Sequence, residues 1–287
     1  MTKRDDEHEA GHPSTSPERL RELADHEEAE VRLQVAGNRV TGAETLAGLA
    51  GDTDPAVRLM VAENPHTPAW ILASLAADAD PYVREMVGGN PNSPREVLAL
   101  LAEDRYWVVR RDVARNPNTS PELLVVLGRD KNKQVRGGAL INVHMPASEL
   151  VACAQSRNRH VRSQVAANPN MPEIALETLS RDRDFGVRRS VAQNTRATEN
   201  ILRTLSRDKV AQVRAFVAHH PKTPLTVLQR LEQDPESAVR QATQWVASHL
   251  VDDEAVLADH TRFDWHLEPR DDGPEWQAKS GLDFDRG

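Results

Sequence analysis

A Val-Arg dipeptide recurs every 26 residues, and this register constrains the fold more than any other feature of the sequence. It occurs nine times without an insertion, at Val31-Arg32, Val57-Arg58, Val83-Arg84, Val109-Arg110, Val135-Arg136, Val161-Arg162, Val187-Arg188, Val213-Arg214 and Val239-Arg240. A leucine keeps the same step from Leu20 to Leu228. An asparagine closes seven successive repeats from Asn38 to Asn194, before His220 takes its place. A fixed period of this kind is the signature of a repeat array in which each unit contacts only its neighbours.

The repeat at 65–90 predicts two helices. Thr67-Pro68 has the form of an N-cap followed by proline at the first helical position, and Asp80-Pro81 starts a second helix in the same way. The apolar stripe of the first helix is Ile71, Leu72 and Leu75. Val83 and Val87 lie four residues apart on the second helix, which is too short to be stable without stacking.

The sequence therefore predicts an all-α solenoid of nine 26-residue, two-helix repeats over residues 13–246. Aromatic residues make up only 4% of the chain, which suits thin layers of small aliphatic side chains better than one large core. Residues 1–12 form a charged N-terminal tail. Residues 247–287 form an acidic C-terminal tail that we expect to be largely disordered or docked.

Polar residues at fixed register positions are expected to connect the repeats. An aspartate precedes the valine by five residues in seven repeats, and His26 and Ser156 replace it in the other two. The arginine of each Val-Arg pair is expected to reach either the aspartate six residues earlier or that of the adjacent repeat, so that Arg136 and Arg162 are structural. The asparagine at each junction is expected to hydrogen-bond turn backbone between layers.

The segment at 57–68, Val-Arg-x-x-Val-Ala-x-Asn-Pro-x-Thr-Pro, is echoed at 109–120 and resembles the leucine-rich repeat variant family. The Asp-x-x-x-x-Val-Arg segment also resembles HEAT repeats. The resemblance covers residues 13–246 and implies a right-handed superhelix in which longer α-helices alternate with shorter, sometimes 3₁₀-like, helices. A described iron–sulfur member carries a cysteine cluster ahead of its repeats. Residues 1–12 contain no cysteine, so no cofactor is expected here.

Charge is distributed unevenly along the repeats. The first three repeats have a net charge of −7, repeats four to nine have a net charge of +8, and residues 247–287 have a net charge of −7. Five consecutive repeats place a base directly after the turn aspartate or its replacement, at Arg105, Lys131, Arg157, Arg183 and Lys209. Three more bases, Arg129, Arg181 and Arg207, flank the same turns. Equivalent positions lie about 10 Å apart in stacked helices, which predicts a basic ridge formed by these eight residues.

The basic ridge has two readings, a solvated edge or a contact surface for a polyanion or an acidic partner. The acidic tail of the chain itself is one candidate to dock on it. Trp70, Tyr82, Tyr106 and Trp107 form a second candidate surface, an aromatic patch in repeats three and four. These rings either fill a layer or anchor a protein partner, since Trp and Tyr dominate interface energetics.

Catalytic and metal signals are weak. His8-Glu9-Ala10-Gly11-His12 matches the zinc-protease string, but Gly11 and Pro13 are expected to break any helix there, so no metal site is expected. Cys153 occupies a slot that is leucine in the other repeats and is expected to be a core residue. His220 is expected to substitute for the junction asparagine.

We therefore expect a non-catalytic scaffold that binds a protein partner through its extended surface. A nucleic-acid binder that uses the basic ridge is the alternative. No stretch approaches 18 apolar residues and the first ten residues have no apolar core, so the sequence favours a cytoplasmic, bacterial-type protein without a membrane span.

Overall fold

The computed structural model describes residues 3–249, which form only α-helices joined by short turns. The repeats belong to one unit, Met1–Gln244. The all-α repeat fold predicted from the 26-residue register is confirmed, and the shorter helix of each described repeat is α rather than 3₁₀. The acidic tail beyond the end of α19, and its expected docking on the basic ridge, lie outside the described residues.

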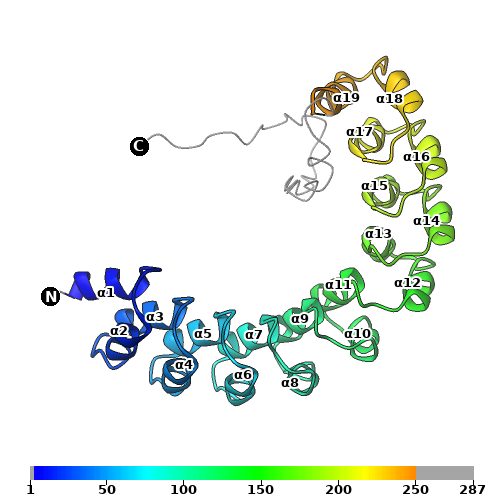
Figure 1. Cartoon of the computed structure of the whole chain (residues 1–287). Coiled ribbons are helices and arrows are strands. Elements are labelled where there is room, and N and C mark those ends of the chain that lie inside the picture. Colours follow the sequence, from blue (N-terminus) through cyan, green and yellow to red (C-terminus); the bar gives the residue numbers. More distant parts are fainter. Residues whose placement is uncertain (1–2, 250–287) are drawn as a thin grey trace, which may run out of the picture. The chain divides into compact units, whose positions relative to one another are not determined.

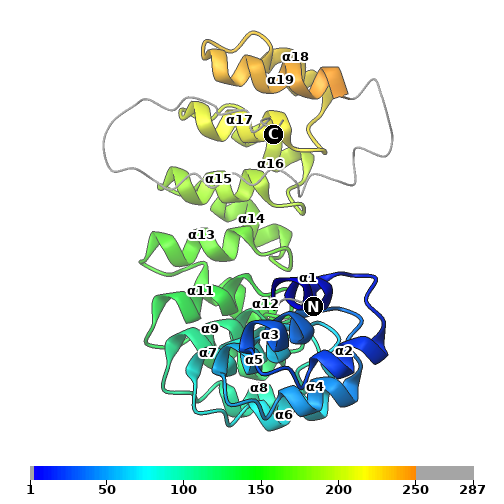
Figure 2. The same cartoon turned by 90° about the vertical axis from the view of Figure 1, so that its left-hand side faces the viewer.

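The helices form two layers (Figure 1). The odd-numbered layer consists of α1 (Lys3–Gly11), α3 (Ala29–Gly37), α5 (Pro55–Glu63), α7 (Pro81–Gly89), α9 (Trp107–Arg115), α11 (Lys133–Ile141), α13 (Arg159–Ala167), α15 (Phe185–Gln193), α17 (Ala211–His219) and α19 (Ser237–His249). The even-numbered layer consists of α2 (Pro17–Leu23), α4 (Ala43–Leu49), α6 (Ala69–Leu75), α8 (Arg95–Leu101), α10 (Pro121–Leu127), α12 (Ala147–Cys153), α14 (Glu173–Leu179), α16 (Glu199–Leu205) and α18 (Leu225–Leu231). From α1 to α17, each odd-numbered helix packs against the next one in its own layer, as Figure 2 also shows.

Each repeat contributes a thin slice of core. In the repeat at 65–90, Ile71, Leu72, Val83 and Val87 are fully buried and Leu75 is nearly so. The odd-numbered helix starts at an aspartate or asparagine in five repeats; Asp80, for example, accepts a hydrogen bond of 2.8 Å from the Tyr82 amide. That side chain satisfies one of the free N–H groups at a helix start.

The N-cap predicted for the even-numbered helix is wrong. Pro68 occupies the N-cap of α6, and the buried Thr67 hydroxyl donates instead to the Val61 carbonyl at 2.6 Å. The physical reason is the end of α5, whose last carbonyls have no partner within their own helix. Five other repeats make the same bond, in the pairs Thr15 to Glu9, Thr41 to Val35, Ser93 to Val87, Thr119 to Val113, and Thr223 to Val217.

The junction asparagines connect successive repeats, as the sequence predicts. The Asn64 amide donates to the Ala36 carbonyl at 2.8 Å and to the Asn38 carbonyl at 3.0 Å, and its oxygen accepts from the His66 amide. Each buried asparagine thus satisfies carbonyls left over at the end of the preceding repeat. His220 takes this role in its repeat, with its ring Nε2 3.1 Å from the Asn194 carbonyl.

The same bonds show that the array begins earlier than residue 13. Asn38 donates to the carbonyls of Ala10 and His12, and Ala10 is fully buried, so α1 occupies the position of the second helix of a repeat. The expectation that Gly11 and Pro13 prevent a helix is wrong, because α1 ends at Gly11 and both residues fall at its C-terminal end.

We expect Asn116→Ala to lower the free energy of unfolding by about 1–3 kcal/mol, because it leaves two buried carbonyls without a donor. Asn116 is 1% exposed and donates 2.8 Å bonds to the carbonyls of Gly88 and Asn90. Urea denaturation measures the change. The exposed Asn200→Ala is the control, and an equal loss in both variants would contradict a structural role for the asparagine row.

Candidate binding surface

In seven repeats the arginine of the Val-Arg pair binds backbone carbonyls of the turn before its own helix and forms an ion pair with the aspartate of the next repeat. The Arg58 Nη1 donates to the backbone carbonyl of Asp52, six residues earlier, at 2.8 Å. Its Nε and Nη2 bind both carboxylate oxygens of Asp78, in the next repeat, at 2.6 and 3.0 Å. Seven such ion pairs lie in the described residues, at Arg32–Asp52, Arg58–Asp78, Arg84–Asp104, Arg110–Asp130, Arg162–Asp182, Arg188–Asp208 and Arg214–Asp234.

This ion-pair ladder has one gap. Arg136 donates to the carbonyls of Asp130 and Lys131 at 2.7 and 2.9 Å, as the other arginines do at their own turns. Ser156 stands where the next aspartate would be, so Arg136 makes no ion pair within residues 3–249. The ion pair expected between Arg136 and an aspartate is therefore not formed, and Arg136 is held only by backbone carbonyls.

The ladder explains the exposure of the basic ridge. The turn aspartates point toward the arginine of the preceding repeat, and their side chains are only 5–11% exposed in these pairs. They are therefore occupied by the ladder. The bases at the next position, Arg105, Lys131, Arg157, Arg183 and Lys209, are all exposed, and Arg157 follows Ser156 rather than an aspartate. The turns of repeats two and three carry the same aspartate without a flanking base.

The three flanking arginines of the ridge differ in their partners. Arg129 lies 3.2 Å from the Glu149 carboxylate, and Arg181 lies 3.8 Å from Glu177 on α14, the helix that it follows. The Arg207 side chain makes no hydrogen bond or ion pair in the described part of the chain. Its charge is the least compensated of the three.

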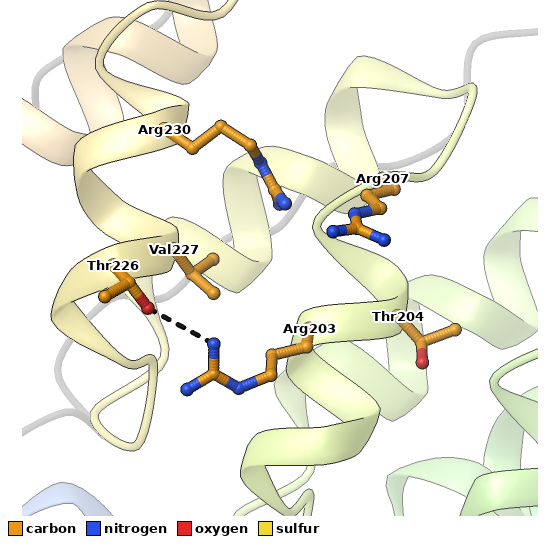
Figure 3. A pocket seen from close by; sticks show the side chains of 6 residues that line it. All are labelled: Arg203, Thr204, Arg207, Thr226, Val227 and Arg230. Carbon is orange, nitrogen blue, oxygen red and sulfur yellow. Dashed lines mark hydrogen bonds between the residues drawn. The ribbon is translucent and has the colours of Figure 1, made fainter.

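Arg207 also lines a hollow that the sequence analysis did not find. The hollow has a volume of about 400 Å³ and is lined by Arg203, Thr204, Arg207, Thr226, Val227 and Arg230, from α16, the residues that follow it, and α18 (Figure 3). The signal that could have revealed it is a register comparison of the even-numbered helices.

The structure divides the aromatic patch. Tyr82 is 60% exposed in the first turn of α7, and Tyr106 and Trp107 are 39% and 40% exposed at the start of α9. Trp70 is 61% exposed but lies at the start of α6. The rest of that helix, a length of about 8 Å, separates Trp70 from the turn that leads to Tyr82.

Arginines lie over two of these rings. The Arg105 guanidinium lies 4.7 Å from the centroid of Tyr106, and that of Arg111 lies 5.5 Å from Trp107. Arg111 also binds the carboxylates of Glu85 and Asp112, both at 2.6 Å. Burial, together with the charge of Asp112, raises the pKa of Glu85. The aromatic start of α9 is thus continuous with a charged network on the odd-numbered layer.

Two further residues from the sequence analysis have structural roles. Cys153 is half-buried at the end of α12, and burial raises the pKa of its thiol, which favours the unreactive protonated form. His12 stands 26 residues before Asn38, and its Nδ1 accepts a hydrogen bond from the Ser14 amide in the way that a junction asparagine does. No group of three metal-ligating side chains occurs among the described residues, and none of their helices is long and apolar enough to span a membrane.

Protonation of the ladder carboxylates is expected to make the wild-type protein less stable in acid. The Arg58 hydrogen bond lowers the pKa of Asp78, although burial acts in the opposite direction. A carboxyl group whose folded-state pKa is lowered stabilises the fold above its unfolded pKa of about 3.9, and this contribution is lost as the pH falls through the folded value. The free energy of unfolding should therefore fall less steeply in Asp78→Asn than in wild type as the pH is lowered from about 5 to about 2. This range extends about one to two units on either side of the unfolded pKa. The exposed Glu96→Gln is the control, and parallel pH profiles for wild type and Asp78→Asn would contradict the expectation.

The gap in the ion-pair ladder at Ser156 predicts that replacing Arg162 and Arg136 by alanine will lower stability by different amounts. Arg162→Ala leaves the Asp182 carboxylate unpaired at low exposure and should destabilise the fold by about 2–4 kcal/mol. Arg136→Ala removes only backbone bonds and should cost about 1 kcal/mol. Ser156→Asp should complete the ladder and raise the melting temperature of wild type but not of Arg136→Ala. Equal losses for the two arginine variants would show that the carboxylate bonds contribute nothing.

Comparison with known proteins supports the resemblance seen in the sequence. Residues 55–80 match the family model of the leucine rich repeat variant. A solved structure described as a leucine-rich repeat variant with a novel repetitive structural motif is 26% identical, with a TM-score of 0.51, and the match covers 77% of this chain and 87% of that one. These two findings confirm the relationship to leucine-rich repeat variant proteins and the helical-repeat fold.

Two further structures are less similar. The Escherichia coli protein YibA is 17% identical with a TM-score of 0.44, over 85% of this chain and 96% of that one. An engineered protein is 16% identical with a TM-score of 0.36, over 86% and 94% of the two chains. A comparison with curated protein sequences finds no match.

Proposed function

We propose that this helical-repeat array, which shares its repeat with leucine-rich repeat variant proteins, is a non-catalytic scaffold that binds a protein partner through the basic ridge. The observation that carries the proposal is the pairing of the turn aspartates with the ladder arginines. It leaves the ridge bases exposed at one register over five repeats, so their charges add along one edge.

An acidic segment of a protein is the partner that fits this edge best. Exposed lysine and arginine side chains select partners by complementary charge and increase the rate of encounter. The arginines stacked on Tyr106 and Trp107 continue the ridge into a region with exposed rings, which are favoured at protein interfaces. A nucleic acid is the alternative polyanion for the same ridge.

The test compares two variants with the same change in charge. In the first, Arg105, Lys131, Arg157, Arg183 and Lys209 are all replaced by Gln. In the control, Gln replaces five exposed bases that lie outside the ridge, namely Arg21, Arg39, Arg95, Arg115 and Arg196. Binding of a poly-glutamate peptide and of a single-stranded oligonucleotide is measured at several salt concentrations, because one value does not separate specific contact from bulk attraction.

We expect the ridge variant to bind the acidic peptide about tenfold or more weakly than the control variant at low salt, with a smaller salt dependence. Equal binding by the two variants would show that the ridge is only a solvated edge. Stronger binding of the oligonucleotide than of the peptide, lost in the ridge variant alone, would favour the nucleic-acid alternative. Retention of native partners after nuclease treatment of a lysate supports the protein partner.

A further inference from the structure

Three arginines face one hollow between neighbouring even-numbered helices. Arg203 lies on α16, Arg207 follows the end of that helix, and Arg230 lies on α18. Figure 3 shows their guanidinium groups directed toward a common space of about 400 Å³. We propose that these three side chains form a binding site for a phosphate monoester group.

Hydrogen bonds hold two of the three side chains at the hollow. The Arg203 Nη1 donates to the Thr226 hydroxyl at 3.2 Å, across the two helices. The Arg230 Nη2 donates to the Ser206 carbonyl at 3.1 Å and also to the Ser206 hydroxyl. Each guanidinium has five N–H donors, so these contacts leave most of them available to a ligand.

The charges of the three arginines are poorly compensated. Burial lowers the pKa of Arg230, and the positive charges of Arg207 and Arg203 lower it further. The nearby acids are Glu199, which forms an exposed ion pair of 3.6 Å with Arg203 at the start of α16, and Asp234, which already pairs with Arg214 at 2.7 Å. A bound anion would relieve the repulsion among the guanidinium groups.

The other repeats provide an internal comparison. The three positions in the preceding groove hold Glu177, Arg181 and Thr204, and Glu177 pairs with Arg181. One groove earlier they hold Val151, Gln155 and Thr178, and before that Val125, Arg129 and Ala152. None of these grooves has more than one base at the three positions. Stacking alone therefore does not require three arginines here.

The lining indicates which anion fits. A phosphate monoester carries a charge of about −1.5 to −2 and three acceptor oxygens, which match several guanidinium forks. The lining contains two threonines and a single aliphatic side chain, Val227, and no aromatic ring on which a nucleobase would stack. The hollow thus recognises the phosphate group itself, whether it is free or carried on a peptide.

The test titrates the full chain with inorganic phosphate and with a phosphoserine peptide by calorimetry at low salt. The unphosphorylated peptide and a poly-glutamate peptide of equal charge are the comparison ligands. We expect the phosphopeptide or phosphate to bind wild type at least about tenfold more tightly than Arg203→Gln/Arg230→Gln, with little binding of the unphosphorylated peptide. Arg39→Gln/Arg95→Gln, which makes the same charge change at exposed positions outside both the ridge and the hollow, should bind as wild type does.

Three outcomes would overturn the proposal. These are equal binding by the two double variants, no binding of phosphate or phosphopeptide to wild type, and binding of poly-glutamate as tight as that of the phosphopeptide. Arg203→Gln alone should reproduce most of the loss of phosphate binding. This single variant keeps Arg230, which contacts backbone, so its melting temperature shows whether the fold is intact when binding is lost. Tighter binding of the phosphopeptide than of inorganic phosphate identifies a modified chain as the source of the ligand, whereas equal binding identifies a small anion.

The inference is independent of the proposed function. None of the five ridge substitutions touches the hollow, and Arg207, which belongs to both surfaces, is unchanged in every variant. A ridge variant that loses acidic peptide but keeps phosphate separates the two sites. A failure of either proposal is therefore measured without affecting the other.

Discussion

The bond from each Val-Arg arginine to the aspartate of the next repeat is the interaction on which the rest of the structure depends. A single guanidinium binds the backbone carbonyls of the turn before its own odd-numbered helix. It also binds the carboxylate of the aspartate that follows the next even-numbered helix. This geometry fixes the distance between repeats at the turn edge. The asparagine row fixes it at the opposite end of the odd-numbered helices, where amide groups bind the carbonyls of the preceding repeat. Two parallel rows of polar bonds thus define the stacking that the small aliphatic side chains fill.

The ladder also decides what the surface presents. Without the arginine partner, each turn aspartate would neutralise the base beside it, and repeats four to eight would have a mixed edge. Because the aspartates are drawn toward the ladder, as Asp182 is toward Arg162 at 2.7 Å, the adjacent bases face solvent uncompensated. A structural interaction thereby creates the charge pattern on which the proposed binding depends.

Much of the fold was predictable because it repeats. The two-helix unit, the buried leucine and valine positions, and the asparagine contacts all follow from residues that recur at one step. The role of the Thr67 hydroxyl was not predictable, since the choice between capping α6 and binding the Val61 carbonyl depends on how closely α5 ends beside it. Helix α1 was missed because its residues resemble the repeat only at Ala10 and His12.

The candidate sites were predictable only in part. The basic ridge follows from neighbours along the chain, and its bases are exposed as the register suggests. The arginine hollow combines positions 27 residues apart on different helices, Arg203 and Arg230, together with the turn residue Arg207. Only the packing of α16 against the following repeat brings them together. The aromatic patch shows the opposite case, because Trp70 is close to Tyr82 in sequence but lies at the other end of α6.

The missing aspartate at Ser156 has a consequence for cooperativity. In a one-dimensional array, stability is the sum of terms within repeats and terms between neighbours, so folding spreads from one repeat to the next only as far as each interface transmits it. At the interface between α11 and α13, the two repeats are connected by backbone bonds and apolar contact but not by an ion pair. The coupling between repeats five and six should therefore be weaker than at the interfaces that have the ion pair, and this interface lies within the basic ridge. A ligand that spans the ridge would add a connection across the place where the chain lacks one.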